Sequence, residues 1–131
     1  MKDETKLWIT YARENLDSAI VLLRSKLFNP CLQNVQQCAE KALKALLIEF
    51  SIKFKKTHSI SELKSILNQN QIDIELSDEE CEFLDSIYLP SKYPIGSVLP
   101  EFEPDIDICN YGLKVSTHIF EIVCNKLKCK I

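Results

Sequence analysis

Glycine is scarce in this chain of 131 residues, and that scarcity limits the folds it can form. Only Gly96 and Gly112 are present. Sandwiches and barrels need many turns with positive φ, and glycine is the residue that usually supplies them. We therefore expect a few long elements, and hence helices.

Other features that the sequence lacks exclude whole classes of protein. A net charge of −3 disfavours general binding to nucleic acid or to anionic membranes, which needs a basic field. No apolar run approaches the ~18 residues that a membrane span needs. Lys2, Asp3, Glu4 and Lys6 interrupt the start of the chain, so no signal peptide is predicted. With 46% hydrophobic and 27% charged residues, residues 1–131 are predicted to form a single globular domain. Without a predicted signal peptide or membrane span, a cytoplasmic location is expected.

The six cysteines do not form a metal-binding pattern. No two of them are arranged as C-x-x-C, and neither His58 nor His118 lies at ligand spacing from a cysteine. Most fall at apolar helical positions, where a thiol behaves as a small hydrophobic group. We expect core cysteines and no metal.

Hydrophobic periodicity predicts five helices. Apolar residues recur at spacings of three and four, which is typical of one helix face. The expected helices cover about residues 3–27, 30–54, a short stretch after Ser59, a stretch from Ser77 to near Tyr88, and 105–128. Ser59 and Ser77 each begin an S-x-x-E capping box. The fold class is therefore predicted as all-α, an antiparallel up-and-down bundle of four to five helices.

The second and the last of these helices differ in how their polar and apolar residues are distributed around the helix. In the second, polar residues gather opposite the apolar face, namely Gln33, Gln37, Glu40, Lys41 and Lys44. Glu40 and Lys44 form a favourably oriented i,i+4 pair. The last helix is apolar over most of its circumference, which predicts burial on more than one side, either at the centre of the bundle or against another subunit.

A proline-rich segment separates the last two helices. Residues 89–104 contain four prolines, which should prevent a continuous helix and leave a long loop packed across the bundle. At its start, Tyr88 and Tyr93 flank Lys92. Tyrosine rings can stack on a base and an ammonium can meet a phosphate, although both rings could instead plug the end of the bundle.

Charge is distributed unevenly along the chain. Residues 41–64 contain six lysines and only two glutamates, whereas residues 73–107 contain eleven carboxylates and one lysine. A local positive site on an acidic protein is therefore compatible with the composition. The carboxylates of residues 78–85 are expected to form a solvated helix face rather than a cation site.

Three separated segments together resemble the HEPN domain family. They are the run Gln36–Leu47, the run Lys56–Leu63 and the run Tyr88–Pro94, and the first helix with Trp8 also fits. The resemblance implies a helical bundle that commonly dimerises and has a nucleotide- or RNA-related role. It also implies pairing in many cases with a minimal nucleotidyltransferase, some pairs acting as toxin and antitoxin.

The resemblance also implies an activity that this chain departs from. Toxic members are metal-independent ribonucleases that use an Arg followed after four to six residues by a His. The two arginines here, Arg13 and Arg24, have no such His, and Lys92 stands where an Arg is usual. Lysine cannot make the bidentate contact with phosphate that arginine makes. The resemblance therefore points to a non-catalytic or attenuated member, with no catalytic residue and no cofactor assigned.

Three functions remain open at this stage. The first is a homodimeric module that binds a nucleotide, RNA or a nucleotidyltransferase subunit, with a candidate ligand site formed by Lys41, Lys44, His58, Tyr88, Lys92 and Tyr93. The second is a weak ribonuclease that uses His58 with Lys92 or Lys41. The third is a purely structural homodimerisation domain.

Overall fold

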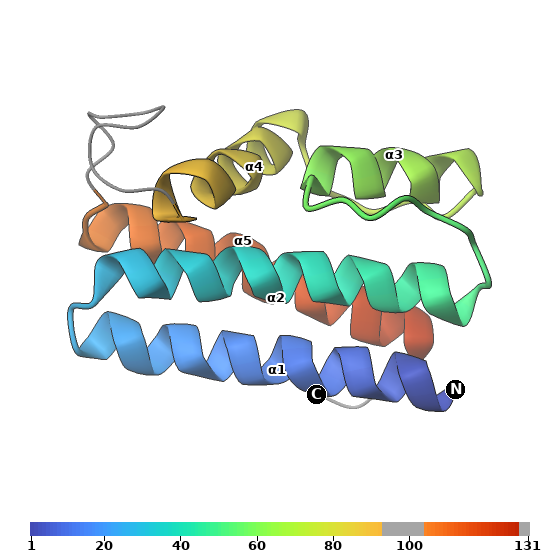
Figure 1. Cartoon of the computed structure of the whole chain (residues 1–131), viewed down its shortest axis with the longest axis horizontal. Coiled ribbons are helices and arrows are strands. Elements are labelled where there is room, and N and C mark those ends of the chain that lie inside the picture. The colour runs from blue at the N-terminus through green and yellow to red at the C-terminus, as the bar shows by residue number, and fades with distance from the viewer. Residues whose placement is uncertain (93–103, 129–131) are drawn as a thin grey trace.

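The structure is a computed structural model that describes residues 1–92 and 104–128, with only the backbone described for residues 89–92. Within these ranges the chain forms five helices and no strand. They are α1 (Asp3–Arg24), α2 (Phe28–Glu49), α3 (Ile60–Gln69), α4 (Asp78–Lys92) and α5 (Ile106–Leu127) (Figure 1). The predicted all-α bundle is confirmed.

Helix α2 is the centre of the bundle. It contacts each of the other four helices, and α1 lies antiparallel beside it (Figure 1). Helices α3 and α4 follow one another along a second side of α2, and α5 packs against both α2 and α1. Thirteen of the 22 residues of α2 are buried, so this helix has no broad face in water.

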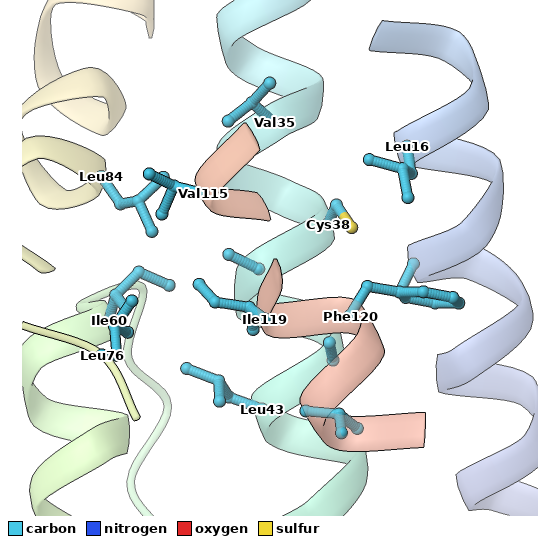
Figure 2. Close-up of a cluster of buried hydrophobic side chains, with 14 of the residues drawn as sticks. Leu16, Val35, Cys38, Leu43, Ile60, Leu76, Leu84, Val115, Ile119 and Phe120 are labelled. Carbon is cyan, nitrogen blue, oxygen red and sulfur yellow. The ribbon is translucent and has the colours of Figure 1, made fainter. Parts of the chain in front are cut away.

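The core is built from side chains of every helix. Figure 2 shows Leu16, Val35, Cys38, Leu43, Ile60, Leu84, Val115, Ile119 and Phe120 meeting with Leu76, which precedes α4. Helix α5 approaches α2 and α4 closely at Gly112, where an added Cβ would lie 3.2 Å from Val35 Cγ1 and 3.3 Å from Phe83 Cε2. A larger residue there would crowd the packed side chains, which is destabilising in a dense core.

The two helix starts that were predicted from capping boxes agree well with the structure. Ser77 Oγ accepts from the Glu80 amide at 3.1 Å, and Glu80 Oε1 accepts from the Ser77 amide at 2.9 Å, which completes a capping box. At α3 only half of the box forms. Ser59 Oγ accepts from the Glu62 amide, but the Ser59 amide donates to Thr57 Oγ1 instead of to Glu62.

The predicted bounds of the second helix are wrong at both ends. Helix α2 begins at Phe28, so Pro30 lies inside the first turn and does not open the helix. Proline is tolerated there because first-turn amides have no partner within the helix. The helix ends at Glu49 rather than near Phe54, since Ser51 adopts φ 55° and turns the chain.

The predicted end of the fourth helix is also wrong. Helix α4 continues through Pro90 to Lys92, whereas the sequence predicted a loop from residue 89. A single proline removes one hydrogen bond and crowds the preceding turn, so a helix near its end can pass through it at a cost of about 3 kcal/mol. Residues 93–103, the rest of the predicted loop, lie outside the described residues.

Helix α5 is buried on more than one side, as predicted. It packs against α2 and against α1, and its buried residues include Val115, Ile119, Phe120 and Val123. It is not the central helix, however, because α2 has that place. None of the helices in the described part is both long enough and apolar enough to cross a membrane.

Five cysteines lie in the core, namely Cys31, Cys38, Cys81, Cys109 and Cys124. Burial raises the pKa of the Cys38 and Cys109 thiols to about 12. Thiolate is the reactive form, so these groups should be inert in the folded protein. In a Cys129→Ser variant, we expect Ellman's reagent at about pH 8 to label none of the five thiols until urea unfolds the chain. Rapid labelling of the folded protein would contradict this.

Candidate functional site

A buried carboxylate on α2 organises the candidate site. Glu40 is only 8% exposed, yet its two oxygens accept hydrogen bonds from three side chains. Lys44 Nζ donates at 2.9 Å, Gln36 Nε2 at 3.1 Å and His58 Nδ1 at 3.1 Å. Gln36 Nε2 also donates to the backbone carbonyl of His58 at 3.1 Å, which ties α2 to the start of α3.

This network keeps Glu40 ionised. Burial alone would raise the pKa of its carboxyl, but the hydrogen bonds from Lys44, Gln36 and His58 and the positive charge of Lys44 outweigh burial and lower it. An ionised carboxylate can only accept hydrogen bonds. His58 Nδ1 therefore carries a hydrogen, and Nε2 is the ring atom left to accept a proton.

His58 is held in place from a second direction by a residue of α4. Its ring stacks on that of Tyr88 with a centroid separation of 4.5 Å and an interplanar angle of 15°. The side chain of His58 is 43% exposed, although its carboxylate partner is buried. The site is thus an imidazole at the surface that is fixed by two contacts. The Glu40 carboxylate accepts from its Nδ1, and the Tyr88 ring stacks on one of its faces.

The structure brings together three of the six predicted ligand residues, Lys44, His58 and Tyr88. Lys44 is 6% exposed, and its Nζ lies 5.9 Å from the centroid of the Trp8 ring of α1. Its ammonium group is paired with Glu40 and is not directed to solvent. Lys41 points to α1, where its Nζ donates to Asn15 Oδ1 at 2.8 Å and lies 5.8 Å from the Tyr11 ring. The side chain of Lys92 and the whole of Tyr93 lie outside the described residues.

Two residues of the predicted polar side of the second helix, Glu40 and Lys44, are buried. Gln36, Glu40 and Lys44 follow one another at intervals of four and form one buried row. Gln33, Gln37 and Lys41 form the neighbouring row, which is partly exposed beside α1. Both rows have the same four-residue spacing, and a helical wheel places them on one polar side, so the sequence does not show which row is buried.

Asp85 of α4 is a further residue that sequence reasoning missed. Its carboxylate was expected on a solvated face, but it caps the first turn of α3. Oδ1 accepts from the Ile60 amide at 2.5 Å, and Oδ2 accepts from the Ser61 amide at 3.2 Å and from the hydroxyls of Ser61 and Ser59 at 2.8 and 3.1 Å. The negative charge also suits a helix N-terminus. Asp85 lies one turn before Tyr88, so it fixes the part of α4 that carries the stacked ring.

The second histidine lies apart from this site. The His118 ring is exposed on α5, and its Nε2 donates to the backbone carbonyl of Glu75 at 3.1 Å. This contact gives His118 a structural role, since it ties α5 to the segment before α4. Within the described residues, no group of three or more His, Cys, Asp or Glu side chains is placed to hold a metal ion.

Comparison with known proteins gives consistent results over nearly the whole chain. Residues 5–127 match the family described as HEPN domain. The protein "Putative toxin MJ1304" of Methanocaldococcus jannaschii is 27% identical over 136 residues, which cover 94% of this chain and 88% of that protein.

Solved structures share the same fold. The crystal structure of an archaeal HEPN homologue has a TM-score of 0.72 and 26% identity, and the match covers 97% of this chain and 99% of that one. A protein from Thermus thermophilus has a TM-score of 0.78 and 25% identity, with 95% and 99% covered. The helix order, the bundle and the family match agree, and this chain belongs to the HEPN domain family.

Proposed function

We propose that this protein is a binding module whose site is the stacked pair of His58 and Tyr88, and that its ligand is a nucleotide or RNA. The observation that supports it is the way His58 is held. A buried carboxylate fixes its ring, Tyr88 stacks on one face of that ring, and 43% of the His58 side chain remains exposed, where a further planar ring would continue the stack. A nucleobase is planar and stacks on aromatic rings, usually with a gain of about 1–3 kcal/mol per base.

The proposal includes a protein partner. Members of this family are commonly paired with a minimal nucleotidyltransferase, and one relative of this chain bears the name of a toxin. We propose that this protein acts in a toxin–antitoxin-like pair. Calorimetry with ATP, GTP and a short RNA, with and without a candidate nucleotidyltransferase subunit, tests both ideas. An absence of heat and of co-elution in every combination would refute them.

A homodimer through α1 is part of the same proposal. Three large apolar side chains of α1 face solvent in the single chain, since Leu7, Tyr11 and Val21 are 49%, 45% and 57% exposed. Helix α5, the alternative, leaves Ile106 and Tyr111 about equally exposed at 48% and 43%, but Tyr111 packs edge-on against Phe83. Light scattering of wild type and of Val21→Glu distinguishes the two helices, because only an α1 interface should be disrupted.

Substitution of Tyr88 separates a ligand platform from a ring that only fills space. We expect Tyr88→Ala to weaken nucleotide binding by roughly 5- to 150-fold, the loss of one stacking contact. Tyr88→Phe keeps the ring and should bind like wild type. Urea unfolding supplies the control. If Tyr88→Ala lowered the free energy of unfolding by about 3 kcal/mol or more while the folded fraction bound the nucleotide as tightly as wild type, Tyr88 would instead be a side chain that only fills the core.

The Glu40–His58 hydrogen bond also favours a second candidate, a weak ribonuclease. A carboxylate that fixes an imidazole through Nδ1 leaves Nε2 as a proton acceptor. In this reaction, Nε2 would remove the proton from an RNA 2′-hydroxyl, the oxygen would attack the adjacent phosphorus, and the bond to the 5′-oxygen would break, with water protonating that oxygen. The reaction also needs a cation that stabilises the negative charge of the phosphate. Lys41 donates to Asn15 instead, so Lys92 is the cation proposed for this role.

Labelled RNA decides whether this activity exists. Wild type should cleave it, His58→Ala should not, and His118→Ala should cleave like wild type because that ring lies on α5 and contacts Glu75. Cleavage that survives His58→Ala, or that is absent from wild type, would rule out the ribonuclease and leave the binding module as the proposed function.

A further inference from the structure

In the connection between α2 and α3, partly buried and exposed residues alternate from Ile52 to Lys55. The site described above does not use this segment. Ile52 and Phe54 pack against the core, whereas Lys53, Lys55 and Lys56 are exposed. Figure 1 shows this connection running from the end of α2 along α3 to the point where α3 begins beside α4. In an extended chain, residues two apart lie about 7 Å from each other on the same side, which places Lys53 and Lys55 together. Lys56 follows Lys55 directly and is exposed at a bend. The segment, here called the lysine row, therefore presents three exposed ammonium groups within four residues.

These three lysines carry charge that the described residues do not neutralise. None of them forms an ion pair or a side-chain hydrogen bond within the described part of the chain. The two carboxylates nearest in sequence have other partners, because Glu49 accepts from Lys2 and Thr5, and Glu62 accepts from Thr57. By contrast, Lys44 and Lys64 are paired with Glu40 and Asp78.

The row of lysines leads directly to the stacked rings. Lys56 precedes His58 by two residues, and His58 stacks on Tyr88. The N-terminus of α3, which would otherwise attract a phosphate at this point, is already occupied by the carboxylate of Asp85. Among the side chains that the structure describes, the lysine row is therefore the nearest source of unpaired positive charge along the chain for a phosphate next to His58.

We infer that Lys53, Lys55 and Lys56 bind the sugar–phosphate backbone of a single-stranded polynucleotide, one of whose bases stacks at His58 and Tyr88. The inference rests on the proposed function and makes the ligand a polymer rather than a mononucleotide, since three cations in a row can contact successive phosphates. The acidic stretch that follows α3, with Asp73, Glu75, Asp78 and Glu79 exposed, repels a polyanion and confines it to the lysine side.

Salt dependence of binding tests this surface. The probe is a fluorescently labelled single-stranded oligonucleotide, prepared as RNA and as DNA, followed by anisotropy at increasing KCl. Each phosphate contact on a single strand contributes roughly 0.7 to the slope of log K against log salt, so three lysines should contribute about 2. We expect the variant Lys53→Gln/Lys55→Gln/Lys56→Gln to lose about that much slope. At low salt it should bind at least ~10-fold more weakly than wild type.

A matched variant controls for net charge. Lys114→Gln/Lys126→Gln/Lys128→Gln removes the same three charges from exposed positions in and just after α5, and it should keep the wild-type slope. Equal slopes for wild type and the variant of the lysine row overturn the inference alone, as does calorimetry in which wild type binds ATP as tightly as the oligonucleotide. Absence of binding to any nucleotide or oligonucleotide overturns the proposed function as well.

Discussion

Glu40→Ala should destabilise this protein by about 3–5 kcal/mol, which is a large share of the roughly 5–15 kcal/mol by which an ordinary domain is stable. The side chain of Glu40 is 10% exposed and that of Lys44 is 8% exposed, with 2.9 Å between Lys44 Nζ and Glu40 Oε2. Removing the carboxylate leaves a buried ammonium without a counter-charge, leaves His58 Nδ1 without its acceptor, and leaves Gln36 Nε2 with only the His58 carbonyl. Urea unfolding followed by circular dichroism measures the loss.

The chain contains its own control for this effect. Arg13 and Asp17 of α1 form an ion pair with the same i,i+4 spacing, but their side chains are 47% and 63% exposed and the atoms lie 3.5 Å apart. Asp17→Ala should therefore cost less than about 1 kcal/mol. Removing both buried charges together, as in Glu40→Leu/Lys44→Met, should recover most of the loss, because an apolar pair needs no counter-charge. Similar losses for Glu40→Ala and Asp17→Ala would contradict the buried network.

The same network predicts a dependence of stability on pH. The pKa of Glu40 is lower in the folded protein than its ordinary value of 4.5, so the unfolded chain binds the proton more readily. The contribution of Glu40 to the free energy of unfolding is therefore complete above that value, and it is lost as pH falls through the folded-state pKa. The stability difference between wild type and Glu40→Gln should be large at neutral pH and should narrow in acid. A difference that stays constant with pH would contradict the ionised carboxylate.

Local sequence signals predicted the helix starts better than the helix ends. Capping is a short-range interaction, and the Ser77 box forms as its residues predict because both partners lie within three positions of each other. Helix α4 nevertheless continues through Pro90, where local propensity predicted a stop. Propensity is a weak preference that the packing of the whole helix can override.

The candidate site was predictable only in part, for a related reason. His58 and Tyr88 could be selected from their residue types, but their stacking joins residues 30 positions apart and depends on how α3 meets α4. The sequence grouped Glu40 and Lys44 with the polar side of the second helix, and polar residues on a helix usually face solvent. With helices on several sides of α2, Glu40 and Lys44 instead contact each other, Gln36 and His58. No local pattern distinguishes these two environments.

Asp85→Ala is the other substitution for which we expect a large effect, a loss of about 2–4 kcal/mol of stability. Its carboxylate accepts four hydrogen bonds at the start of α3, two of them from the backbone amides of Ile60 and Ser61. Ile60 is fully buried, so water cannot easily replace the lost acceptor. Glu82→Ala, an exposed carboxylate on the same helix, should change stability by no more than about 0.5 kcal/mol.

The Asp85 variant also tests whether helix capping and ligand binding are coupled. Tyr88 follows Asp85 by one helical turn, so loosening the cap should let the ring move away from His58 and weaken nucleotide binding without removing either ring. Amide hydrogen exchange at Ile60 and Ser61 reports the loss of the cap directly and should accelerate in Asp85→Ala but not in Glu82→Ala. Faster exchange with unchanged nucleotide binding would mean that the stacking of His58 on Tyr88 does not need the Asp85 cap, because Glu40 alone holds the His58 ring in place. Unchanged exchange would mean that Asp85 does not cap α3, because those two amides would then have another acceptor.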